Sequence, residues 1–427
     1  MRPIRWDIYE EHLEEAAFRW SQRERALDSP DDALEEVAEL EAHMSSHLDA
    51  LILGGEHVAR QLLEPGMNAD DAERVVASTL ALLSGEKPHG PTAVLAMLRQ
   101  AKPPVLALLL RALELADPLI IAADLSSLLK QGDSVPGLLA LVIETLGTHG
   151  FATAALCKPF LTHPEPQVAA AALHATSRMR LPLDPNVLQR ALDSTEWVLR
   201  DAAIVAGLMS AHRSAWTACK AELEAPRLNC RLPLLLVAMG GTERDTERLI
   251  ALLSNEELRP NVLWALGFTG SIIAAEACLT VMRNKPVAAL AAEAFSAITG
   301  LRIEGNYAAE RLDLEEEELT PLEQEDALPR PRVDAVTEWW QQVRPRMDAR
   351  KRYLAGQPLT AQVLLDALAR TPMRRRHALA LALALRSRGT FQLPTRALVK
   401  RQIAIWQQAR AITPSILSQS FAEGLHG

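Results

Sequence analysis

Apolar residues recur at spacings of three and four along most of the chain, which is the period of a helix with one buried face. The clearest run follows the Ser-Pro-Asp-Asp turn at residues 29–32, with apolar side chains at Leu34, Val37, Leu40, Met44, Leu48 and Leu51. An earlier apolar stripe lies within the acid-rich segment that contains Trp6, Leu13 and Trp20. Residues 1–66 are therefore expected to form an N-terminal helical cap of two or three helices.

A short unit recurs from residue 67 to residue 301. In each copy a helical stretch ends at a glycine or small residue, a turn follows, and a second helical stretch leads to an acidic or proline-marked turn. The matching landmarks are separated by 32, 28, 33, 27 and 33 residues and fall at Gly147, Met179, Gly207, Gly240, Gly267 and Gly300. A period near 30 residues with two helices per period predicts an all-α fold, a HEAT-like α-solenoid.

Small residues line the predicted helix seams. Val198, Leu199, Ala202, Ala203 and Ala206 share one face, and alanines there let a neighbouring helix approach closely. A single helix pair cannot bury such a seam alone, so we expect neighbouring pairs to stack.

The repeat pattern stops after residue 301. Residues 302–335 are acidic and proline-rich and are predicted to form a linker or strap. Residues 336–427 form a C-terminal basic helical region, with helices expected over 336–354, 357–369, 374–386 and 397–411. Whether this region caps the solenoid or forms a separate small domain stays open.

Composition and targeting signals agree with this interpretation. Hydrophobic residues make up 48% of the chain and aromatic residues only 4%, so leucine, alanine and valine must fill the core. The four cysteines form no CxxC pair, and we expect small buried thiols rather than a metal or disulfide site. We find neither a signal peptide nor an apolar run long enough for a membrane span, and we expect a cytoplasmic protein.

Charge is divided along the chain. Residues 7–41 hold 13 acidic and 3 basic residues, and residues 304–338 hold 12 acidic and 3 basic ones. Residues 344–410 hold 15 lysines and arginines against two aspartates. The basic region is therefore expected to contact the acidic strap or an acidic protein; the alternatives are a merely solvated charged face and, more weakly, contact with nucleic acid phosphates.

Catalytic motifs are missing from the sequence. It has no phosphate-binding GxxxxGK loop, no GxGxxG, no GxSxG and no HExxH. It also lacks the His-Glu pairs through which the HEAT-repeat enzyme deoxyhypusine hydroxylase binds iron. Glu39, His43 and His47 share a helix face, but we interpret the histidines as surface residues. The sequence predicts no enzyme, no cofactor and no metal.

Candidate partner-binding residues lie in the basic region. They are two adjacent tryptophans, an Arg-Tyr pair and three consecutive arginines: Trp339, Trp340, Arg352, Tyr353, Arg374, Arg375 and Arg376. Tryptophan and arginine are enriched in the residues that dominate protein interfaces. The alternative interpretation buries both tryptophans between the C-terminal region and the solenoid.

The terminal segments resemble an uncharacterised bacterial family of HEAT-repeat proteins encoded in type VI secretion gene clusters. The similar segments are Asp7-Ile8, His12, residues 14–18, Trp20, His47-Leu48 and Leu51, followed by Trp339-Trp340, residues 352–358, residues 374–378 and Arg401-Gln402. The resemblance implies an accessory role near spike-tip proteins and effectors, and it carries over no catalytic residue.

Three functions remain from the sequence. The first is a non-enzymatic adaptor that holds a spike-tip protein or an effector of the secretion apparatus. The second is an immunity protein against one cognate effector, and the third is a nucleic-acid-binding or base-excising solenoid. The sequence determines neither the partner, the oligomeric state nor the solenoid face that binds.

Overall fold

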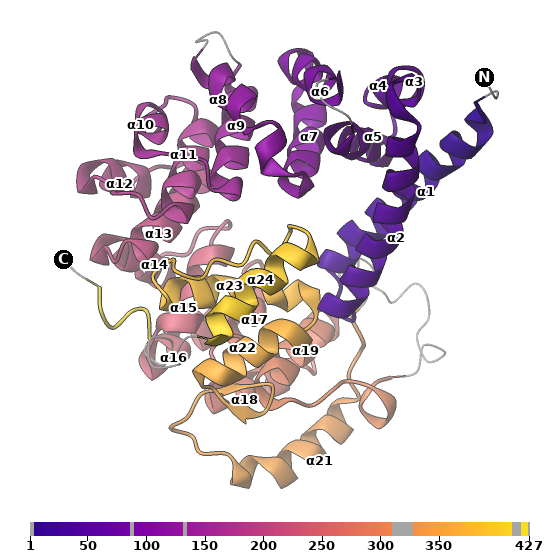
Figure 1. The fold of residues 1–427 in the computed structure, drawn as a ribbon. Coiled ribbons are helices and arrows are strands. Elements are labelled where there is room, and N and C mark those ends of the chain that lie inside the picture. Colours follow the sequence, from indigo (N-terminus) through magenta and orange to yellow (C-terminus); the bar gives the residue numbers. More distant parts are fainter. Residues whose placement is uncertain (1–3, 86–88, 131–134, 310–327, 412–419, 426–427) are drawn as a thin grey trace. The chain divides into compact units, whose positions relative to one another are not determined.

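The computed structural model describes residues 4–85, 89–130, 135–309, 328–411 and 420–425 (Figure 1). Its first helices are α1 (Trp6–Leu27), α2 (Leu34–Leu53), α3 (Gly55–Val58), α4 (Glu64–Gly66), α5 (Ala72–Ser84), α6 (His89–Gln100), α7 (Pro103–Leu115), α8 (Ala122–Lys130), α9 (Pro136–His149), α10 (Ala154–Cys157), α11 (Pro166–Arg178), α12 (Pro185–Leu192) and α13 (Trp197–Met209). A π-helical turn, Ala59–Leu63, joins α3 to α4.

The later helices are α14 (Arg213–Glu224), α15 (Arg231–Gly240), α16 (Glu243–Ala251), α17 (Arg259–Leu266), α18 (Ile272–Val281), α19 (Ala288–Thr299) and α21 (Val333–Val343). A short hairpin of β1 (Tyr353–Leu354) and β2 (Gln357–Pro358) precedes α22 (Ala361–Arg370), α23 (Met373–Arg386) and α24 (Val399–Ala411). Among the described residues this hairpin is the one paired sheet, so the predicted all-α class is confirmed.

Alternate helices stack in rows, as a HEAT-like solenoid requires. The odd-numbered row runs through α5, α7, α9 and α11, and again through α15, α17 and α19. The even-numbered helices α14, α16 and α18 form a second row. The predicted landmarks mark the ends of the odd-numbered helices: Gly147 lies in the last turn of α9, and Gly300 directly follows α19. The predicted α-solenoid is therefore confirmed.

Local sequence explains where these helices begin. Asp71 accepts hydrogen bonds from the backbone amides of Glu73 and Arg74 at the start of α5, at 2.9 and 3.2 Å. Thr242 and Asp245 form a reciprocal capping box at the start of α16. These side chains pair amides that have no partner within the helix.

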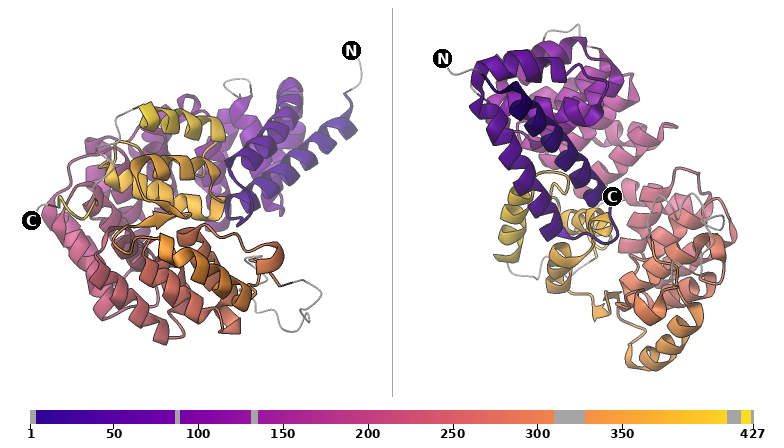
Figure 2. Two further views of the ribbon diagram at one scale, coloured as in Figure 1. Left: turned by 90° about the horizontal axis from the view of Figure 1, so that it is seen from below. Right: turned by 90° about the vertical axis from the view of Figure 1, so that its right-hand side faces the viewer.

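The chain divides into two compact units. Unit 1 holds residues 1–206, 372–374 and 392–407, and unit 2 holds residues 207–371, 375–391 and 408–427. This division does not follow the expected boundaries at residues 66, 301 and 335. Within unit 1, α1 and α2 lie side by side as an antiparallel pair and both contact α5, so the N-terminal helices continue the stack (Figure 1, Figure 2).

The C-terminal region contributes segments to both units instead of forming a domain of its own. Helices α23 and α24 lie close to the predicted ranges, but the helices expected over 336–354 and 357–369 are wrong in part. The chain leaves α21 at Val343 and forms the β1–β2 hairpin before α22 begins. Of the predicted strap, residues 310–327 lie outside the described residues. Described residues on either side of that range are hydrogen-bonded to each other: the Ala309 amide donates to the Arg330 carbonyl at 2.9 Å.

The four cysteines, Cys157, Cys219, Cys230 and Cys278, are buried, as predicted for small thiols. Burial raises the pKa of the Cys278 thiol to about 12, so this thiol stays protonated at neutral pH. Within the described residues, no helix combines the length and apolar character needed to cross a membrane.

Two glycines that follow odd-numbered helices provide a matched prediction. Gly150 and Gly300 both have left-handed backbones, with φ of +83° and +80°. A Cβ at Gly150 would meet nothing within 4 Å, whereas one at Gly300 would lie 2.7 Å from the Ala355 carbonyl oxygen in the hairpin turn. Left-handed strain costs a non-glycine residue about 1–2 kcal/mol.

Gly150→Ala is therefore expected to cost about 1–2 kcal/mol of unfolding free energy. Gly300→Ala should cost clearly more, because the hairpin must also move. Chemical denaturation of both variants measures the difference. Equal losses would show that the hairpin does not pack on the end of α19.

Candidate functional site

The predicted tryptophan pair packs on α19. Both rings stand edge-on to Phe295, with ring centres 6.2 Å away for Trp339 and 5.3 Å away for Trp340. Trp340 is 5% exposed and Trp339 is half-buried. The prediction that Trp340 contacts a partner is therefore wrong, because its ring is needed to hold α21 against the solenoid.

The three consecutive arginines also serve the fold. The Arg375 guanidinium lies 4.0 Å from the ring centre of Phe268 and 3.6 Å from the Glu293 carboxylate. Arg376 is fully buried and donates through Nε to the Leu368 carbonyl at 2.6 Å, and burial lowers its pKa to about 10. Both are wrongly predicted as partner contacts, since their charged groups face the protein interior. Arg374 is half-buried, and its amide donates to the Ser29 carbonyl at 3.1 Å.

Arg352 binds the carboxyl end of a solenoid helix. Its guanidinium donates to the carbonyls of Ala238, at 3.4 Å, and Met239, at 2.7 Å, near the end of α15, and to that of Gly241. Burial lowers the pKa of Arg352. Its neighbour Tyr353 is buried and donates its amide to the Gly270 carbonyl at 2.8 Å. The predicted partner role of Tyr353 is wrong for the same reason as that of Trp340.

Other donors of the C-terminal region bind carbonyls at the carboxyl ends of odd-numbered helices, as Arg352 does at α15. The last carbonyls of a helix have no partner within it and carry the negative end of the helix dipole, so an incoming donor stabilises them. The donor–acceptor pairs, each from the C-terminal region to a helix end, are Arg401 to Thr148 (2.5 Å), Gln392 to Arg178 (2.9 Å), Ala355 to Ala297 (2.8 Å), Gly356 to Ile298 (2.9 Å) and Ser420 to Gly240 (3.1 Å). Within each unit, the region's donors therefore pair the ends of solenoid helices.

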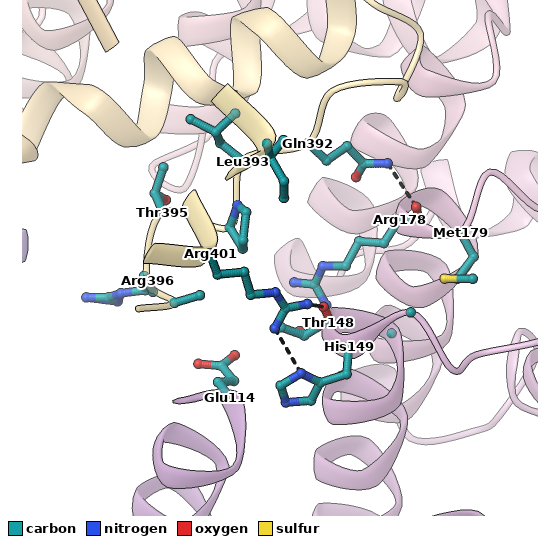
Figure 3. Close-up of a pocket in the computed structure, with 15 residues that line it drawn as sticks. Glu114, Thr148, His149, Arg178, Met179, Gln392, Leu393, Thr395, Arg396 and Arg401 are labelled. Carbon is teal, nitrogen blue, oxygen red and sulfur yellow. Dashed lines mark hydrogen bonds between the residues drawn. The ribbon is translucent and has the colours of Figure 1, made fainter. Parts of the chain in front are cut away.

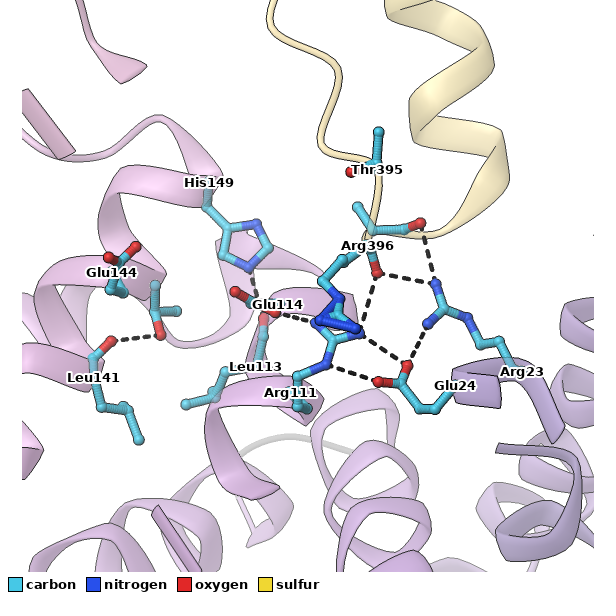
Figure 4. Close-up of polar contacts among 12 residues, drawn as sticks. Arg23, Glu24, Arg111, Leu113, Glu114, Leu141, Glu144, His149, Thr395 and Arg396 are labelled. Atoms are coloured by element: carbon cyan, nitrogen blue, oxygen red, sulfur yellow. Dashed lines mark hydrogen bonds and ion pairs between the residues drawn. The ribbon is translucent and has the colours of Figure 1, made fainter. Parts of the chain in front are cut away.

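A buried polar network binds residues 396–399 in unit 1, and Figure 4 shows the part formed by Arg23, Glu24, Arg111 and Arg396. Arg23, fully buried in α1, donates to the carbonyls of Arg396 and Ala397 at 3.0 and 3.1 Å. Its Nε donates at 2.9 Å to Glu41, whose other carboxylate oxygen accepts the amide of Val399 at 2.7 Å. Glu41 thus pairs a free amide at the start of α24.

Glu24 and Arg111 complete this network. Arg111 donates to Glu24 at 2.9 and 3.1 Å and forms a second ion pair with Glu114. Burial raises the pKa of Glu41, and the Arg23 charge opposes that rise.

The sequence analysis missed Arg23 and Glu41, although the sequence holds a signal for both. Each charged residue interrupts an apolar helix face, as Glu41 does between Val37 and Met44.

A pocket of about 420 Å³ lies in unit 1 beside this segment (Figure 3). The ends of α9 and α11 form one wall, and residues 392–397 with α24 form the other. Its charged lining residues are Glu114, Arg178, Arg396 and Arg401. The Arg401 guanidinium donates to Nδ1 of His149 at 2.9 Å, and Nε2 of His149 lies 2.6 Å from the Leu113 carbonyl.

This geometry sets the protonation of His149. Nε2 must carry the proton to donate to a carbonyl, so Nδ1 accepts from Arg401 and the ring is neutral. Burial lowers the pKa of His149, and the nearby Arg401 charge lowers it further. His149 therefore orients Arg401 in the pocket wall.

Glu144, an ion-pair partner of Arg178, predicts acid sensitivity of unit 1. Burial alone would raise the pKa of this carboxyl, but the charges of Arg178 and His174 outweigh burial and lower it from 4.5 to about 2. A lowered carboxyl pKa stabilises the fold above pH 4.5, and that stabilisation is lost as the pH falls towards 2. Because Arg178 is partly solvent-exposed, we expect about 1–2 kcal/mol.

Unfolding free energies of wild type and Glu144→Gln between pH 7 and pH 3 measure this contribution. The difference between the two proteins should shrink as the pH falls. A difference independent of pH would refute an electrostatic role for Glu144.

The metal-binding alternative gains no support from the histidines of α2. Nδ1 of His47 lies 3.0 Å from Nδ1 of His12, and His43 is exposed. Within the described ranges, no three His, Cys, Asp or Glu side chains group closely enough to hold a metal ion.

No protein-family model matches the chain, and no curated protein matches it. A crystal structure of a mutant of Kap121p is similar over 97% of this chain and 45% of that one, with 12% sequence identity and a TM-score of 0.28. The chain thus spans less than half the length of that Kap121p chain. The solenoid assignment rests on the helix rows themselves, and the resemblance to the secretion-associated bacterial family stays a prediction.

Proposed function

We propose that the protein is a non-enzymatic, cytoplasmic scaffold or adaptor that binds another protein and is associated with type VI secretion. The observation that supports this proposal is how the solenoid binds a non-helical segment of its own chain. In unit 1 the non-helical segment 392–397 lies against the ends of α9 and α11 and is bound through backbone carbonyls by Arg23 and Arg111. A surface that binds backbone atoms of its own chain has the chemistry needed to bind a partner's backbone.

The link to type VI secretion comes from the sequence resemblance at both ends of the chain. Two of its most specific stretches, residues 352–358 and 374–378, hold the β-hairpin and the arginines that bind the solenoid. These residues therefore preserve the scaffold, and the partner must contact other surfaces. The exposed parts of unit 1 beside residues 392–397 are the candidates.

Co-purification tests this proposal. The tagged full chain is recovered from a cell with an active secretion system, and bound proteins are identified by mass spectrometry. We expect recovery of a spike-tip protein or effector encoded in the same cluster, and no recovery from a strain in which that gene is deleted. Recovery of no cluster-encoded protein in repeated experiments would refute the adaptor role.

A further inference from the structure

We propose that the pocket between α9, α11 and residues 392–401 binds a carboxylate side chain from an acidic segment of a partner protein. This proposal rests on the proposed function and adds to it the chemistry of the partner. It starts from the three arginines of the pocket, which come from three different elements (Figure 3).

Among the described residues, one arginine of the pocket has no carboxylate partner. Arg178 pairs with Glu144, and Arg396 pairs with Asp28 at 3.2 Å. Arg401 forms no ion pair among the described residues; it donates only to a carbonyl and to the neutral His149. Burial lowers the pKa of Arg401 because no carboxylate offsets the lost hydration. A partly buried cation without a counter-ion favours an anionic ligand.

The other two arginines are accessible from solvent. The Arg178 side chain is 37% exposed and that of Arg396 is 47% exposed. The Arg396–Asp28 ion pair is exposed on both sides, so it is solvent-screened and worth little, and the Arg396 guanidinium can turn to an incoming carboxylate at small cost, whereas Arg178 stays paired with Glu144. Gln392, Thr148 and Thr395 add hydrogen-bonding groups to the lining.

The size of this charge favours a peptide carboxylate over nucleic acid. Arg401 is the one lining arginine without an ion pair among the described residues, and a single cation matches a single carboxylate. A nucleic acid backbone brings a phosphate charge at every nucleotide, and it would meet the carboxylates of Glu114, Glu144 and Asp28 around the pocket. An acidic peptide can place one glutamate or aspartate in the pocket and keep neutral residues beside it.

The test uses a fluorescein-labelled octapeptide of alternating glutamate and serine, with a glutamine-for-glutamate peptide as the neutral probe. Fluorescence anisotropy with the full chain measures affinity. Arg396→Gln keeps the backbone carbonyl that holds the segment and should weaken binding of the acidic peptide about three- to tenfold. Arg401→Gln should weaken it more than tenfold, and Arg401→Lys, which keeps the charge, should weaken it less.

Arg350→Gln is the matched control, because its side chain is 92% exposed and lies in unit 2. It should change the affinity less than about twofold. Equal losses in Arg350→Gln and Arg396→Gln, or equal binding of both peptides, would overturn the carboxylate pocket. Binding of inorganic phosphate that the acidic peptide cannot displace would also overturn it.

The same variants separate this inference from the proposed function. If wild type captures a cluster-encoded protein and Arg396→Gln and Arg401→Gln capture it equally well, the scaffold role stands and the pocket assignment is wrong. If the acidic peptide binds as expected but no partner is captured, the pocket stands and the adaptor role is wrong.

Discussion

Replacing Arg23 with methionine is expected to lower the free energy of unfolding by about 3–5 kcal/mol, the usual cost of removing one member of a buried ion pair. Methionine keeps most of the volume, so the loss reports on charge and hydrogen bonds. Glu41 would remain buried without Arg23, and the carbonyls of Arg396 and Ala397 would lose their donor. Urea denaturation followed by circular dichroism measures the change.

The effect of Arg23→Met should depend on pH. Burial already raises the pKa of Glu41 above 4.5, and loss of the Arg23 charge should raise it further. Above its raised pKa, the buried Glu41 is charged, and without Arg23 this charge destabilises the fold. The destabilisation by Arg23→Met should therefore shrink as the pH falls and Glu41 becomes protonated. Arg25→Met, at an exposed position of α1, is the matched control and should stay within about 0.5 kcal/mol. A pH-independent loss would contradict the role given to Glu41.

Replacing Arg352 with alanine is expected to destabilise unit 2 by about 2–3 kcal/mol, because hydrogen bonds from a charged donor are worth more than neutral ones. Three carbonyls at the end of α15 would lose their donor. Arg352→Lys should recover less than half of the loss, since a single ammonium cannot reach three separate carbonyls as the planar guanidinium does. Urea denaturation gives the free energies.

Arg350→Ala removes a side chain that is 92% exposed and should leave stability within about 0.5 kcal/mol of wild type. Hydrogen exchange should also show faster opening of α15 in Arg352→Ala and not in the Arg350 variant. Equal stability of the two variants would show that Arg352 does not hold the end of α15.

The solenoid was predictable because its signals are local. Each helix is signalled within a few residues, by the helical spacing of apolar residues, by proline in its first turn and by small residues in its last turn. These signals recur in each repeat. Gly147 illustrates this: a Cβ there would lie 2.8 Å from the Cβ of Ala175, so α9 and α11 approach closely only at a glycine. The prediction of close helix contacts at small residues therefore followed from the sequence.

The roles of the arginines were not predictable in the same way. Arg352 and Met239 are separated by 113 residues, and backbone carbonyls leave no trace in the sequence. A basic stretch looks the same whether it binds phosphates, a protein or helix ends. The hairpin was missed because its strands have two residues each and its turn places Ala355 at a positive φ of 50°, which alanine rarely adopts.

The role of the C-terminal region in pairing helix ends is tested most directly by hydrogen exchange of the full-length protein. The amides of Tyr353, Ala355 and Gly356 donate to solenoid carbonyls, and Glu41 accepts the amide of Val399. All four should exchange as slowly as the neighbouring amides of α19 and α2. If they exchange as fast as amides in exposed turns, the C-terminal region is not bound to the solenoid, and the roles given to its arginines are wrong.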